Sequence, residues 1–103
     1  MARITKINAR QKLAEAPEEK RFWLADGRYL QNLEELASAL LDMSTETFQY
    51  HVSEGKNDFA TWVRDVFGED ELSAGLAKAA DQAPSARLVA NRAAYLKSRR
   101  SWR

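Results

Sequence analysis

Apolar residues recur with a helical period along most of the chain, and the clearest case lies between residues 57 and 68. Asn57 is a residue type that caps helix starts, and Gly68 stands where a left-handed glycine ends a helix. Between them the apolar positions follow the spacing i, i+3, i+4, i+7, i+8, which places them on one helix face. They are Phe59, Trp62, Val63, Val66 and Phe67. The pattern predicts an amphipathic helix over 58–67.

Caps and apolar stripes predict further helices on both sides of this one. Asn32 precedes a stripe formed by Leu33, Leu36, Leu40 and Met43. Ser44 suits the start of a second, short helix, and the acidic residues at 69–71 suit the first turn of another. Pro84 fits the first position of a last helix. A short helix over 9–16 is also expected, in a segment that we expect to be partly ordered.

Two short apolar runs flank an Asp-Gly pair at 26–27 and predict a β-hairpin. Asp-Gly favours a two-residue turn because glycine adopts positive φ freely. In that register Leu24 would face Tyr29, and Trp23 would face Leu30. The predicted fold is mainly α, a compact cluster of four to five short helices with a small N-terminal β-hairpin.

The net charge of +1 conceals an acidic body between two basic ends. Residues 1–12 carry four basic side chains and no acidic one, and residues 84–103 carry six basic and no acidic ones. The intervening segment holds six basic and fifteen acidic side chains. Such asymmetry indicates partners at the ends, or ends that fold back on the acidic body.

The same pattern divides the chain into three parts. We interpret residues 1–20 as a basic N-terminal arm, residues 21–83 as the hairpin and helical core, and residues 84–103 as a basic amphipathic helix and tail. A chain of 103 residues can bury one core without disulfides or metals.

Composition narrows the classes of function. The chain has no cysteine, which excludes disulfides and thiolate chemistry, and its single histidine cannot share a metal with a second one. We expect no metal and no cofactor. The N-terminus lacks the apolar segment of a secretory signal, and no apolar run approaches the roughly 18 residues of a membrane span. We therefore expect a cytoplasmic protein that does not enter membranes.

The basic ends are the best candidates for a binding surface. Cations interleaved with aromatic residues can neutralise phosphates and stack on bases, so a nucleic acid or a nucleoprotein is one expected partner. The last helix is also amphipathic and could dock into the groove of a protein, which is equally favoured. Its apolar stripe is thin for a membrane surface. The candidate residues are Arg3, Lys6, Arg87, Arg92, Tyr95, Lys97, Arg99, Arg100, Trp102 and Arg103.

A second candidate is a polar corner just before the central helix. It consists of Tyr50, His51, Lys56, Asn57 and Asp58. His51 is the only candidate general base of its type, but no nucleophile and acid are spaced to work with it. Helix capping accounts for Asn57 and Asp58 without any ligand. An enzyme centred on His51 is thus the least favoured hypothesis, and we assign no catalytic residue.

Residues 22–76 resemble a small domain family of bacteria and archaea. The resemblance rests on FWLADGRYLQNLEEL, on the YHV of residues 50–52, and above all on KNDFATWVRDVFGEDEL. That family is uncharacterised, so the resemblance implies no activity and no cofactor. It does imply that the residues of the polar corner lie together.

We expect a small non-catalytic binding module that docks through its basic ends, or a protein-interaction module that uses its last helix. The sequence leaves its oligomeric state open.

Overall fold

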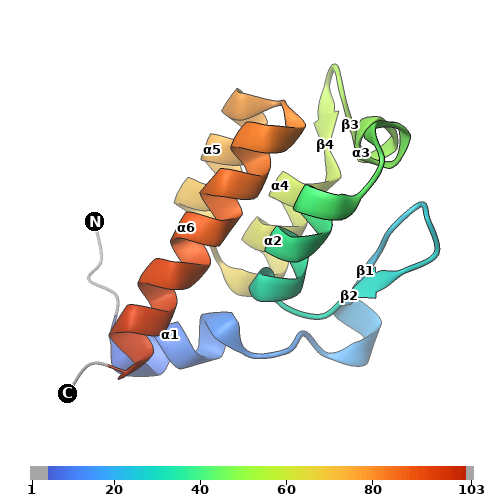
Figure 1. Ribbon diagram of the computed structural model, residues 1–103. Coiled ribbons are helices and arrows are strands. Elements are labelled where there is room, and N and C mark those ends of the chain that lie inside the picture. The colour runs from blue at the N-terminus through green and yellow to red at the C-terminus, as the bar shows by residue number, and fades with distance from the viewer. Residues whose placement is uncertain (1–4, 102–103) are drawn as a thin grey trace.

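The computed structural model describes residues 5–101, and this part of the chain is mainly helical (Figure 1). Its helices are α1 (Lys6–Leu13), the 3-10 helix η1 (Glu18–Lys20), α2 (Leu33–Asp42), α3 (Thr45–His51), α4 (Asp58–Phe67), α5 (Asp70–Ala79) and α6 (Gln82–Ser101). Its strands are β1 (Phe22–Trp23), β2 (Tyr29–Leu30), β3 (Val52–Ser53) and β4 (Lys56–Asn57). The mainly α fold with an N-terminal hairpin is confirmed. The described residues hold six α-helices rather than four to five, and α6 is long.

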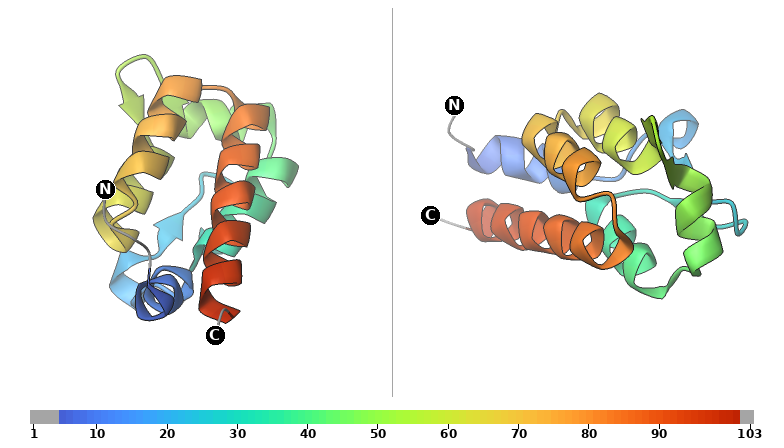
Figure 2. Two further views of the ribbon diagram at one scale, coloured as in Figure 1. Left: turned by 90° about the vertical axis from the view of Figure 1, so that its left-hand side faces the viewer. Right: turned by 90° about the horizontal axis from the view of Figure 1, so that it is seen from above.

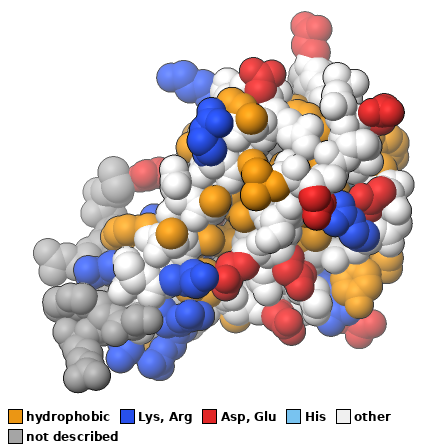
Figure 3. Space-filling model, in the orientation of Figure 1, with side chains coloured by type: hydrophobic (Ala, Val, Ile, Leu, Met, Phe, Trp, Pro, Cys, Tyr) orange, Lys and Arg blue, Asp and Glu red, His pale blue; other side chains and the backbone are white. Residues whose placement is uncertain are grey.

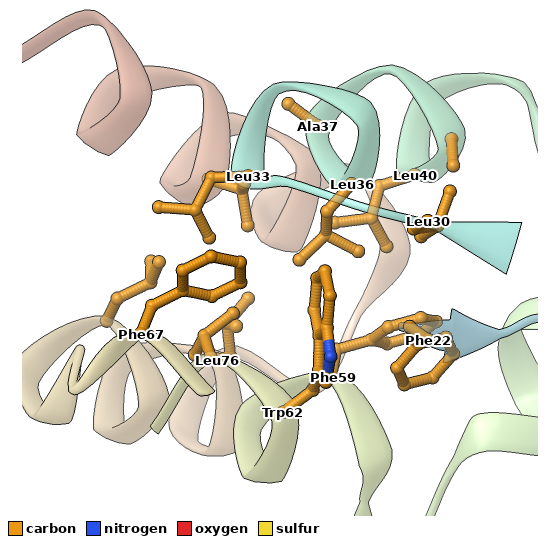
Figure 4. Packing of buried hydrophobic residues seen from close by; sticks show 14 of the residues in the cluster. Phe22, Leu30, Leu33, Leu36, Ala37, Leu40, Phe59, Trp62, Phe67 and Leu76 are labelled. Atoms are coloured by element: carbon orange, nitrogen blue, oxygen red, sulfur yellow. The ribbon is translucent and has the colours of Figure 1, made fainter. Parts of the chain in front are cut away.

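The helices are arranged around one core. Seen from the side, α4 and α5 form one wall, α2 and α6 form the other, and α1 crosses below them (Figure 2). Leu33, Leu36 and Leu40 of α2 point toward the aromatic side chains of α4 (Figure 4). All three leucines and Phe59 are at most 1% exposed. Full burial of such a side chain contributes about 1.5–3 kcal/mol, so these four side chains together stabilise the fold substantially.

Helix boundaries follow the predicted caps closely. Asn32, Ser44 and Asn57 each accept a hydrogen bond from the backbone N–H three residues ahead, at 2.8–3.1 Å. Gly68 ends α4 with a left-handed φ of 66°. The side chains of Asn32, Ser44 and Asn57 thus satisfy backbone N–H groups that a helix leaves unpaired at its start.

The two terminal helices start earlier than predicted. Thr5 accepts a hydrogen bond from the N–H of Asn8 at 3.0 Å, so α1 begins at Lys6 rather than at residue 9. Helix α6 begins at Gln82, two residues before Pro84. The side chain of Gln82 donates to the carbonyl oxygens of residues 40 and 43, at 3.0 and 2.9 Å. This side chain thereby caps the end of α2 and joins it to α6.

The register of the first hairpin differs from the prediction by one residue. Phe22 pairs with Leu30, and Trp23 pairs with Tyr29. The predicted two-residue turn would need positive φ at residues 26 and 27, but within the loop only Gly27 adopts it, with φ 98°. The loop is therefore a three-residue turn that ends in a left-handed glycine. The predicted pairing was wrong, and the observed one buries Phe22 and Leu30 while exposing Trp23 and Tyr29.

A second two-stranded ribbon, which the sequence did not predict, lies between α3 and α4. Val52 pairs with Asn57, and Ser53 pairs with Lys56, around a turn in which Gly55 has φ 86°. The strand β4 leads directly into α4. This ribbon fixes where the polar corner lies relative to the core.

Candidate functional site

The two basic ends of the sequence lie side by side in the fold. Helix α1 packs against α6, and the first turn of α1 and the last turn of α6 lie at the same end of the described structure (Figures 1 and 2). Basic side chains gather there in the space-filling view (Figure 3). We define the basic end as Lys6 and Arg10 on α1 with Arg99 and Arg100 on α6. Arg3, Trp102 and Arg103, which the sequence also suggested, lie outside the described residues.

The geometry of the basic end follows from helix periodicity. Lys6 and Arg10 are four residues apart, so they lie on the same face of α1 and both are exposed. Arg99 and Arg100 occupy the last turn of α6 and are half-buried. Within the part of the chain that the structure describes, Lys6, Arg10 and Arg100 form no ion pair. Their charges are available to an anionic partner.

Arg92, by contrast, is occupied within the fold. Its guanidinium donates two hydrogen bonds to Glu69, through Nε to Oε1 and through Nη2 to Oε2, the latter at 2.9 Å. Glu69 is 3% exposed, although the sequence suggested only an acid in a first helical turn. Burial raises the pKa of Glu69, but the hydrogen bonds from Arg92 and Lys12 outweigh it and hold that pKa below its usual value.

Lys12 completes this ionic cluster from the N-terminal helix. Its Nζ lies 2.8 Å from Oε2 of Glu69 and donates to the carbonyl oxygens of Phe67 and Gly68, at 3.0 and 3.1 Å. One side chain of α1 therefore caps the carbonyl groups at the C-terminal end of α4 and helps to neutralise the carboxylate of Glu69, just before α5. One signal for this cluster was present in the sequence. Arg92 interrupts the apolar stripe of Leu88, Val89, Ala93 and Leu96, and a cation in such a stripe indicates a buried acidic partner.

The remaining candidates on α6 are spread along the helix. Lys97 pairs with Glu34 of α2 at 3.0 Å, and both side chains are nearly half exposed. Tyr95 is 45% exposed, with the Arg92 guanidinium 5.3 Å from its ring centre. Arg87 is exposed, but it lies thirteen residues before Arg100, which is about 20 Å along a helix. The predicted set does not form one surface.

The residues of the polar corner do lie together. Asp58 contacts His51 through an Nδ1–Oδ2 distance of 3.0 Å and Lys56 through an Nζ–Oδ2 distance of 3.3 Å. The Lys56 ammonium is 5.2 Å from the ring centre of Tyr50. Asn57 caps α4 and also donates from its amide to the carbonyl of Leu76, at 3.2 Å.

His51 is buried, and both of its ring nitrogens are engaged within the chain. Nε2 accepts a hydrogen bond from the N–H of Ala25 at 3.0 Å, which requires a lone pair on that nitrogen. Nδ1 must then carry the proton and donate a hydrogen bond to Oδ2 of Asp58. The ring also packs 5.0 Å from Phe22 and 5.3 Å from Phe59. In this arrangement His51 joins the hairpin loop to α4 and leaves no ring nitrogen for a substrate.

No known family model, curated protein or solved structure matches the chain. The resemblance of residues 22–76 to a bacterial and archaeal domain family therefore stays a prediction. No helix of the described residues is long and apolar enough to cross a membrane. In the same part of the chain, no group of three or more acidic, histidine or cysteine side chains is arranged to hold a metal ion.

Proposed function

We propose that this protein is a non-catalytic binding module whose basic end docks onto the phosphates of a nucleic acid or a nucleoprotein. One observation supports the proposal: the packing of α1 against α6 brings Lys6 and Arg10, near one end of the sequence, to the same end of the molecule as Arg99 and Arg100, near the other. Neither segment contains an acidic residue. Clustered cations of this kind gain affinity by releasing the counterions of a phosphate chain.

Favourable interactions with helix dipoles explain the positions of only some of the cations in the basic end. Cations in a last helical turn interact favourably with the negative helix end, which explains Arg99 and Arg100. Lys6 stands at the first position of α1, where a positive charge opposes the dipole. Its presence there suggests a role outside the helix.

The alternative of a protein partner for α6 has less support. The apolar stripe that would enter a partner's groove is already inside the fold, since Val89, Ala93 and Leu96 are at most 5% exposed. An enzyme centred on His51 has the least support, because both ring nitrogens are engaged.

The salt dependence of binding tests the proposal. We would measure the anisotropy of a fluorescein-labelled 20-base-pair DNA and of a single-stranded RNA between 50 and 200 mM salt. With three to four phosphate contacts, the slope of log K against log salt should be about −3 to −4 for the duplex. Absent binding, or binding that is insensitive to salt, would exclude the proposed mode.

A matched pair of double variants locates the surface. Lys6→Glu with Arg100→Glu reverses one charge on each helix of the basic end. Lys78→Glu with Arg87→Glu makes the same charge change at exposed positions elsewhere. The first variant should weaken binding more than about tenfold, equal to about 1.4 kcal/mol, and the second less than about threefold. Equal losses would mean that net charge, rather than this surface, causes the binding.

A further inference from the structure

The outer face of the first hairpin carries exposed aromatic side chains. Trp23 is 66% exposed and Tyr29 44%, and their ring centres are 5.2 Å apart. Arg21 precedes β1, and its guanidinium lies 5.2 Å from the centre of the Tyr29 ring. Exposed tryptophan is uncommon on a small protein and is enriched at binding surfaces. None of these residues belongs to the basic end.

Beside this face lies a hollow of about 510 Å³ between the start of the hairpin and α4. Phe22, Trp62 and Val66 supply its apolar lining. The indole N–H of Trp62 donates to the carbonyl of Lys20 at 2.7 Å, which ties the two walls together. Arg21 lines the hollow and also stacks on Tyr29, so the hollow and the aromatic face are continuous. We call this combined surface the hairpin groove.

The charged side chains that line the hairpin groove differ in their ion pairing. On the α4 side, Asp58 is paired with Lys56 and Asp65 with Arg64, at 3.3 and 2.9 Å. On the hairpin side, Lys20 and Arg21 have no carboxylate partner within the described residues.

Arg21 is also incompletely satisfied within the fold. Its Nε is buried and has no hydrogen-bond partner. The groove therefore offers apolar surface next to two cations that have no ion pair within the described residues. A ligand that suits it combines an apolar group with a carboxylate.

We propose that the hairpin groove binds an acidic segment of a partner protein, in which an apolar side chain stands next to Asp or Glu. The apolar side chain packs on Val66 and on the exposed edges of Phe22 and Trp62, and the carboxylate pairs with Lys20 and Arg21. Charge-assisted contacts to arginine are the stronger ones, which makes Arg21 the main anchor for the carboxylate. A phosphate chain suits this surface less well, because it has no apolar side chain to place against Phe22, Trp62 and Val66. The proposal is independent of nucleic-acid binding at the basic end.

Peptide titrations followed by ¹H–¹⁵N correlation spectra of the full chain test this proposal. The probe is the acetylated, amidated pentapeptide Glu-Leu-Glu-Phe-Glu. Two comparison peptides replace its glutamates by lysines or its apolar residues by glycines. The first peptide should shift the Trp62 indole signal and the amides of residues 20–22 and 61–66 in a saturable way. The comparison peptides should not.

Lys20→Glu provides the variant, and Lys78→Glu is its matched control because both lysines are exposed. The first substitution should lower the affinity for the peptide about three- to fivefold, and the second should leave that affinity unchanged. The proposal is overturned if no saturable shift occurs up to 1 mM peptide, or if the lysine peptide binds equally well. It is also overturned if a six-nucleotide uridine RNA shifts the same signals more strongly, or if the signals shift with protein concentration alone.

Discussion

The guanidinium of Arg92 on α6 donates two hydrogen bonds to the carboxylate of Glu69, which lies buried where α5 begins. Lys12 of α1 reaches the same carboxylate. Three helices thus share one ionic cluster beneath the surface. The cluster orients α1 against α6, and that contact is also what brings the two basic ends together.

Removal of Arg92 should therefore destabilise the fold more than removal of a neighbouring surface pair. Arg92→Met leaves Glu69 buried with Lys12 as its only remaining cation, and we expect a loss of about 2–3 kcal/mol in the free energy of unfolding. Lys97→Met on the same helix breaks only the exposed pair with Glu34 and should cost at most about 0.5 kcal/mol. Urea unfolding followed by circular dichroism measures both. Similar losses would mean that the cluster adds little.

The lowered pKa of Glu69 predicts a loss of stability in acid. The folded state binds its proton less readily than the unfolded state, whose carboxyl titrates near 4.5. The contribution of Glu69 is therefore complete above about pH 5 and disappears as the pH falls through the lowered folded pKa. In Glu69→Gln that contribution is absent at every pH. The difference in urea midpoint between the two proteins should be smaller at pH 3 than at pH 7, and a constant difference would contradict the assignment.

Ala80 ends α5 with φ 58°, the one positive φ among the non-glycine residues described. An alanine in this left-handed conformation is strained, and glycine is not. Ala80→Gly should raise the free energy of unfolding by about 0.5–1 kcal/mol.

The converse substitution is available in the same chain. Gly68 has φ 66°, and a Cβ there would lie 3.8 Å from the Nζ of Lys12, an ordinary contact. Gly68→Ala should therefore lose about 1 kcal/mol through backbone strain alone. Thermal unfolding of the two variants should shift in opposite directions, and a shift in the same direction would be inconsistent with this reasoning.

His51 should act as a structural link between the hairpin loop and α4. His51→Phe keeps an aromatic ring beside Phe22 and Phe59 but removes both hydrogen bonds. We expect a loss of about 1–2 kcal/mol. The amide hydrogen of Ala25 should also exchange with solvent faster in this variant than in the unsubstituted protein.

Tyr50→Phe is the control, since Tyr50 is 64% exposed, and it should change stability by less than about 0.5 kcal/mol. Nucleic-acid affinity should remain unchanged in both variants. A loss of affinity in folded His51→Phe would show that the polar corner takes part in binding.

Much of the helical fold could be predicted, because its signals are local. Asn32, Ser44, Asn57 and Gly68 act on backbone groups within a few residues of themselves, so a short window of sequence contains the information. The spacing of the apolar stripe in α4 specified its buried face in the same way. The turn at 26–27 was also a local prediction, but it failed. Asp-Gly permits several turns, and the burial of Phe22 and Leu30 against the core selected a different register.

The sequence by itself determined where most helices begin and end, which faces of them are apolar, and that both ends of the chain are basic. Only the tertiary structure decided which charged side chains form ion pairs within the fold and which remain unpaired on its described surface. Arg92 and Lys12 meet Glu69 although they are far apart in sequence, whereas Lys6 and Arg100 form no ion pair with any other residue that the structure describes. The physical reason is that an ion pair depends on distances of a few ångströms between side chains. Those distances arise only when helices remote in sequence pack together.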